Sequence, residues 1–209
     1  MNMPQAVQFS TPDDSDELAR AEVYGLLAHL FYAAPTPALY EQLRKAETAA
    51  PVPGAFLEAS WRELVAAAQR LTIDAVREEF NALFVAIGKP EVFLYGSYYI
   101  AGALNEKPLA ALRHDLRALG LERPQTIHET EDHLASLCEV MRYLIAGEDL
   151  AVSNLASQQR FFDAHLRGWT EALCDALAQH PRADFYRALA LFTRDFLAVE
   201  AQAFDLLNA

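Results

Sequence analysis

The stretch HETEDHLASLCEVMRYLIAG, residues 128–147, decides the fold class of this chain of 209 residues. Its apolar residues recur at i, i+3, i+4 and i+7, the period of one face of an α-helix, and are Leu134, Leu137, Cys138, Met141, Leu144 and Ile145. Gly147 ends the pattern, as glycine often does just after a helix. Similar patterns fill the chain, and no segment alternates with the two-residue period of a β-strand. The sequence therefore predicts an all-α protein.

Further helical segments follow on both sides, with proline and glycine at their joints. We expect a first helix over about 16–33, then a short helix that Thr36 caps and Pro37 opens. Three more are expected, at about 72–88, 98–100 and 108–119, besides one around Phe56–Ala68. Two long helices should complete the chain, one through Phe162–Leu177 and one through Phe185–Phe204. No linker divides the chain, so one domain is expected over residues 16–209.

Composition and charge limit the possible functions. Hydrophobic residues make up 53% of the chain, enough for a core, yet no apolar run approaches the ~20 residues that cross a bilayer. The N-terminus lacks the features of an export signal, so we expect a flexible tail at 1–15 on a cytoplasmic protein without stable membrane insertion. Two cysteines are too few for a disulfide framework. A net charge of −12 without a basic cluster argues against nucleic acid and favours a basic partner.

The segment HETEDHL, residues 128–134, is the first candidate for chemistry because it holds two histidines and three carboxylates. A zinc site of the HExxH type needs histidines four residues apart; here the spacing is five, and on a helix the rings point ~140° apart. Asp132-His133 is similar, in reversed order, to the metal-binding pair of helical phosphohydrolases. The simplest structural interpretation places Glu129, Glu131 and Asp132 around the first turn of a helix, where each carboxylate contributes ~0.3–1 kcal/mol.

The loop IGKPEVFLYGS, residues 87–97, is the second candidate. It is too rich in glycine and proline to be helical, yet it is apolar, so we expect it to pack against a core or to form a binding surface. Its G-x-S sequence at Tyr95–Ser97 does not complete a nucleophile elbow. Gly88-Lys89 lacks the other residues of a phosphate-binding loop.

Three patches of the chain resemble the TorD/DmsD family of cytoplasmic maturation chaperones for molybdenum-containing redox enzymes. They fall in order over about residues 78–197: EEFNALFVAIGKP with LYGSYY, PLAALRHDLRALGL with ETEDHLASLCEVMRYL, and FFDAHLRGWTEAL with FYRALALFTRDFL. The resemblance implies a TorD-like, single-domain bundle of roughly ten helices with no catalytic activity and no cofactor of its own. It also implies that the protein binds the twin-arginine leader of an apo-molybdoenzyme, aids cofactor insertion and delays export.

The resemblance also implies site residues. The family's Glu-Pro-x-Asp-His motif corresponds to residues 129–133, which gives the leader-binding role to Asp132 and His133, and the family's facing loop matches Tyr95, Gly96 and Ser97. A receptor for an arginine pair and an apolar stretch needs carboxylates beside an apolar groove. Candidates for the carboxylates and the groove lining are Glu129, Glu131, Asp132, Phe84, Phe93, Leu94, Tyr95 and Tyr98. The chain departs from the family at Thr130, where the motif has proline, and at Ala86-Ile87 in the loop.

Two alternatives remain open from the residues alone. One is a metal-dependent helical hydrolase that uses Asp132 and His133. Metal that stays bound to the purified protein would indicate this function. The other is a structural helical adaptor, whose partner binding would survive replacement of both residues by alanine. Monomer and domain-swapped dimer also both remain open, because long terminal helices pack within one chain or between chains.

Overall fold

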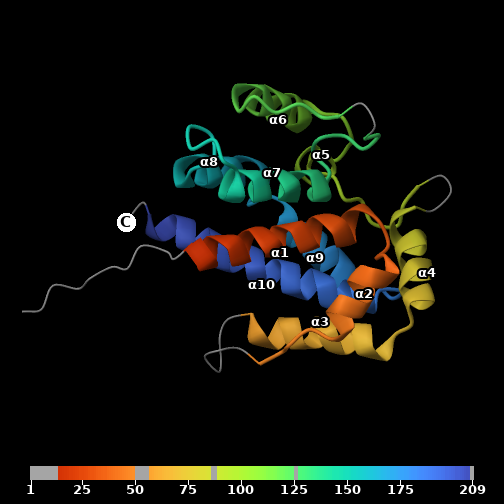
Figure 1. The fold of residues 1–209 in the computed structure, drawn as a ribbon. Coiled ribbons are helices and arrows are strands. Elements are labelled where there is room, and N and C mark those ends of the chain that lie inside the picture. Colours follow the sequence, from red (N-terminus) through yellow and green to blue (C-terminus); the bar gives the residue numbers. More distant parts are fainter. Residues whose placement is uncertain (1–13, 50–56, 86–88, 125–126, 208–209) are drawn as a thin grey trace, which may run out of the picture.

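The structure, a computed structural model, describes residues 14–49, 57–85, 89–124 and 127–207. These residues contain ten α-helices, joined by loops, and no strand (Figure 1). The helices are α1 (Asp14–Tyr32), α2 (Pro37–Arg44), α3 (Glu58–Arg70), α4 (Ile73–Phe84), α5 (Gly96–Ala101), α6 (Lys107–Ala118), α7 (Leu134–Ala146), α8 (Leu155–His165), α9 (Thr170–Gln179) and α10 (Phe185–Leu206). The predicted all-α class and the approximate number of helices are confirmed. The predicted flexible tail falls largely on residues 1–13, outside the described residues, as do Phe56, Ala86-Ile87 and Gly88.

Several helix ends follow from local sequence chemistry. The Thr36 hydroxyl accepts the Leu39 N–H at 3.3 Å with Pro37 in the first turn of α2, and the Thr72 hydroxyl accepts the Ala75 N–H at 3.2 Å at the start of α4. Gly120 ends α6 with a φ of 72°, which lets the Leu121 N–H return to the Leu116 carbonyl at 2.9 Å. These short-range signals are readable in the sequence because each involves neighbouring residues only.

Helix α1 lies in the middle of the molecule (Figure 1). It packs most extensively against α7, while α10 and α3 lie on its other side and α6 is the outermost helix beyond α7. The Tyr24 ring of α1 meets Phe196 of α10 edge-on at 4.9 Å, within one continuous cluster of buried hydrophobic residues. In the described part of the chain, no helix has the length and apolar character needed to cross a membrane.

The single long helix expected through Phe162–Leu177 is wrong, because the chain breaks there into α8 and α9. At the break the Trp169 indole N–H donates to the His165 carbonyl at 2.7 Å, and the buried ring stacks on Tyr99 at 5.6 Å. A Cβ on Gly96 would lie 3.1 Å from this indole, so the backbone of the Tyr95 loop passes directly over Trp169. The apolar spacing continued across the break because residues on both sides of it are buried in the same core.

Candidate functional site

The Tyr95 loop and the HETEDHL segment meet in a short backbone pairing. Tyr95 and His133 form an isolated antiparallel bridge, in which the Gly96 N–H donates to the Asp132 carbonyl at 2.9 Å and the Leu134 N–H to the Leu94 carbonyl at 2.8 Å. We call this pairing of residues 94–97 with 132–134 the Tyr95–His133 joint. The structure thus brings together the two segments that were expected to face each other across a groove, and it closes them directly onto one another.

Asp132 holds this joint together through its side chain. It is 3% exposed, its Oδ2 accepts the Ser97 N–H at 2.9 Å, and its Oδ1 accepts the Thr130 hydroxyl at 2.6 Å. Ser97 is fully buried, and its own hydroxyl has no hydrogen-bond partner among the described residues. Direct contact of Asp132 with a leader stays a prediction, and that contact would require the joint to open, because the carboxylate is buried.

Replacing Asp132 with alanine should lower the free energy of unfolding by about 2 kcal/mol, because it leaves the buried Ser97 N–H without a partner. Urea denaturation of the wild type and the variant measures this difference. Asp74→Ala is a matched control, since Asp74 is 80% exposed and pairs only with Arg77 on the surface; it should change stability by less than about 0.5 kcal/mol. Equal effects of the two substitutions would contradict a structural role for Asp132.

His133 is the N-cap residue of α7 and is 5% exposed. Its Nδ1 accepts the Ala135 N–H at 3.1 Å, so the neutral ring carries its proton on Nε2. Burial lowers the pKa of His133 to about 4, although the charges of Glu129 and Asp132 oppose the shift. The expected placement of Glu129, Glu131 and Asp132 in the first turn of this helix is wrong. They precede it, because the Asp132 carbonyl bonds to Gly96 and the helix begins only at Leu134.

Two further predicted carboxylates engage neighbouring side chains. The Tyr95 hydroxyl donates to Glu129, and burial together with this bond raises the pKa of Tyr95. Glu131 lies between two arginines, with Arg113 Nη2 at 2.8 Å and Arg123 Nε at 3.4 Å. Burial is the largest single influence and raises the pKa of Glu131. The hydrogen bond from Arg113, a backbone hydrogen bond and the charges of both arginines together outweigh it, so the pKa of the carboxyl is lowered.

The predicted apolar residues fall into two groups, one with Phe84, Leu94 and Tyr95 and the other with Phe93 and Tyr98. Phe84 lines a small cavity of about 80 Å³ together with Tyr95, Glu129 and His133. Phe93 and Tyr98 stack on each other at 4.2 Å, and the Lys89 ammonium lies 5.6 Å from the Phe93 ring centre. Neither Phe93 nor Tyr98 lines this cavity.

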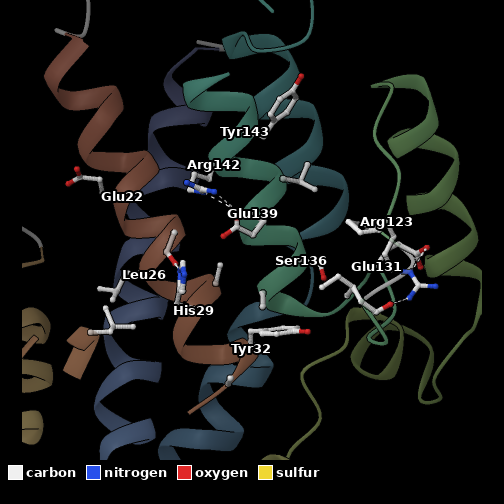
Figure 2. A pocket seen from close by; sticks show the side chains of 18 of the residues that line it. Glu22, Leu26, His29, Tyr32, Arg123, Glu131, Ser136, Glu139, Arg142 and Tyr143 are labelled. Atoms are coloured by element: carbon white, nitrogen blue, oxygen red, sulfur yellow. Dashed lines mark hydrogen bonds and ion pairs between the residues drawn. The ribbon is translucent and has the colours of Figure 1, made fainter. Parts of the chain in front are cut away.

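A groove of about 1070 Å³ opens beside the joint (Figure 2). The outer face of α7 forms its floor, α1 with the start of α2 forms one wall, and the segment from α6 to α7 forms the other. Of the predicted site residues, Glu131 alone lines it. The other lining residues were not predicted from the sequence as site residues, among them Leu26, His29, Tyr32, Ser136, Val140 and Tyr143.

A weak signal for this groove was present in the sequence. On α1, Leu26 and Tyr32 lie off the stripe that Tyr24, Leu27 and Phe31 bury, so the helix is apolar on more than one face. On α7, the spacing of Ser136, Val140 and Tyr143 places them on one face, away from the buried residues. Helices with a second apolar face often bind another element, although the sequence does not say which faces adjoin.

Charged side chains line the groove beside its apolar residues. Four carboxylates line it, Glu22, Glu122, Glu131 and Glu139, against two arginines, Arg123 and Arg142. Arg142 pairs with Glu139 at 2.8 Å and Arg123 with Glu131, whereas Glu22 and Glu122 make no ion pair within the part of the chain that is described. The groove therefore combines an apolar floor with unpaired negative charge. Over the same residues, no cluster of three or more His, Cys, Asp or Glu side chains could hold a metal ion.

Comparison with known proteins gives one family and one fold. The family model described as nitrate reductase delta subunit matches residues 54–175. Chaperone protein TorD of Vibrio cholerae serotype O1, strain O395, is 29% identical over 202 residues, covering 89% of this chain and 92% of the relative, and strain M66-2 gives the same values. A crystal structure of a proposed redox enzyme maturation protein from Archaeoglobus fulgidus matches with a TM-score of 0.55 and 15% identity, over 95% of this chain and 99% of that one. This last likeness shows the fold.

Proposed function

Because the chain belongs to the TorD/DmsD family of redox enzyme maturation chaperones, we propose that it binds a twin-arginine leader peptide. The leader belongs to an apo-molybdoenzyme, which the chaperone retains in the cytoplasm until the molybdenum cofactor has been inserted. Like its relatives, the protein is a chaperone and not an enzyme. Export of the partner then follows only after folding.

The groove on α7 is the observation that carries this proposal. A twin-arginine leader combines two guanidinium groups with an apolar stretch, and the groove combines an apolar floor with the unpaired carboxylates Glu22 and Glu122. The net charge of −12 adds a long-range attraction for a cationic peptide. In the proposed complex the apolar stretch lies along Leu26, Val140 and Tyr143, and the arginines reach Glu22 and Glu122.

In this proposal some residues of the family motif contact the leader directly, and others position the residue that does. Glu131 lines the groove and is an acceptor for the leader. Asp132 and His133 are buried, so they position Glu131 by fixing the turn before α7 to the Tyr95 loop. Tyr95, Gly96 and Ser97 act through the same joint rather than by touching the peptide.

Filling the groove tests the proposal. Ser136→Trp places a large side chain on the α7 floor and should weaken binding of a twin-arginine leader peptide by about tenfold or more, measured by calorimetry. Ala198→Trp on α10 is the control, because residue 198 is exposed and does not line the groove; it should leave the affinity unchanged. Circular dichroism checks that both variants fold. Equal affinity of the Ser136→Trp variant and the wild type would exclude this groove as the binding site.

A further inference from the structure

Two arginines of this chain already form ion pairs with Glu131, the carboxylate of the family motif that lines the groove. Arg113 of α6 donates from Nε to Glu131 Oε2 at 3.0 Å and places Nη2 2.8 Å from the same oxygen. Arg123, in the segment between α6 and α7, places Nε 3.4 Å from Oε1. Figure 2 shows Glu131 and Arg123 together at the α6 side of the groove. Each oxygen of Glu131 therefore faces a guanidinium group.

The two arginines hold Glu131 unequally. Arg113 makes the closer contacts and does not line the groove, whereas Arg123 lines it, lies farther from the carboxylate and also donates to the Ile127 carbonyl. The Glu131 side chain is 14% exposed and lines the groove, so a peptide bound in the groove can reach it. An incoming cation therefore meets Arg123 first and must replace it at Oε1, while Arg113 remains bound to Oε2.

We infer that Arg113 and Arg123 form a specificity filter that favours arginine over lysine in the peptide bound at Glu131. The inference rests on the proposed function, since it concerns how the leader is chosen. A guanidinium from the peptide replaces Arg123 with a planar group that offers the same N–H donors. A lysine ammonium is compact and strongly hydrated, so it cannot match the forked contact that it would displace. Specificity here is a difference between two affinities, so the cost of displacing Arg123, which both peptides share, cancels. The internal arginines increase the difference because Arg113 keeps the carboxylate in an orientation that a guanidinium fork fits and a single ammonium does not.

Two peptides and two double variants test the filter. The peptides are a twin-arginine leader and the same sequence with both arginines changed to lysine, and calorimetry gives Kd for each. Arg113→Gln with Arg123→Gln removes the filter. Arg117→Gln with Arg160→Gln is the control, because it changes the net charge equally and removes two exposed arginines without an ion pair in the described segments.

In the wild type the arginine peptide should bind more tightly than the lysine peptide. In the Arg113→Gln, Arg123→Gln variant both peptides should bind more tightly, and the ratio of the lysine Kd to the arginine Kd should fall about threefold to tenfold. The control should leave the ratio unchanged. In a Glu131→Gln background, removing the two arginines should no longer alter the ratio, because the shared carboxylate is gone.

An unchanged ratio in the double variant, or an equal fall in the control, overturns the filter while leaving the proposed function intact. Failure of the wild type to bind the arginine peptide overturns the proposed function itself. Weaker binding of the arginine peptide by the double variant also overturns the filter. If the double variant does not fold by circular dichroism, Arg113→Gln alone provides the same test, because Arg113 makes the contacts that orient Glu131.

Discussion

Replacing Glu200 with alanine is expected to lower the free energy of unfolding by about 3 to 4 kcal/mol. Glu200 lies on α10, is 2% exposed, and accepts bonds from Nε and Nη2 of Arg20 on α1, each at 2.8 Å. The buried Tyr24 hydroxyl donates to the same carboxylate at 3.1 Å. Alanine removes the acceptor for all three donors and leaves the largely buried guanidinium with only the more exposed Glu17 as a partner.

Chemical denaturation followed by circular dichroism measures this effect. Glu17→Ala is the matched control, because Glu17 bonds to the same Arg20 at 2.8 Å but its side chain is 31% exposed and lies one turn away on α1. That substitution should cost about 0.5 kcal/mol or less. If Glu200→Ala and Glu17→Ala destabilise the protein equally, the buried carboxylate does not hold α1 to α10. Since α1 forms a wall of the groove, Glu200→Ala should also weaken peptide binding.

Acid should destabilise the protein through His133 by about 3 kcal/mol between pH 6.5 and pH 4. The folded protein keeps the buried ring neutral down to a pKa of about 4, whereas the unfolded chain binds a proton near pH 6.5. Within this window the unfolded state therefore holds more protons, so stability falls as the pH falls. Above pH 6.5 and below pH 4 the residue contributes no further change, because both states then carry the same charge.

The variant His133→Asn isolates this effect from the carboxylates that titrate in the same range. Asparagine is a good N-cap and can accept the Ala135 N–H, but it does not bind a proton. The stability difference between wild type and His133→Asn should shift by about 3 kcal/mol in favour of the variant on going from pH 7 to pH 4. A difference that stays constant across this range would show that His133 does not titrate between the two states.

The helices were predictable where the signals are local. Thr36 and Pro37 start α2, Gly120 ends α6, and the apolar stripe of α7 was read correctly from its spacing. The division of α8 from α9 was not predictable, because it depends on Trp169 packing against Tyr99 and beneath Gly96, which lie about 70 positions earlier in the chain. Periodicity reports which residues are buried and does not report whether one helix or two carry them.

The candidate site was predictable in part. The resemblance selected the two segments that meet in the Tyr95–His133 joint. It did not indicate that both oxygens of Asp132 accept hydrogen bonds within the protein, from Ser97 and from Thr130. Nor could the sequence show that the groove lies on the other side of Glu131, because its walls come from α1 and from the segment after α6, which only the tertiary fold places together. Carboxylates near a helix start look alike in sequence whether they face solvent, a neighbouring helix or a groove.

The central place of α1 has a consequence for how the chain acquires its structure. Of the partners that cover this helix, α7 follows it by about 100 residues and α10 is the last helix of the chain, so part of the apolar surface of α1 stays uncovered until α10 has been synthesised. Contacts so distant along the chain slow folding even in an all-helical protein. A protein that protects unfinished enzymes thus passes through an exposed, aggregation-prone stage of its own, which ends only when its last helix is complete.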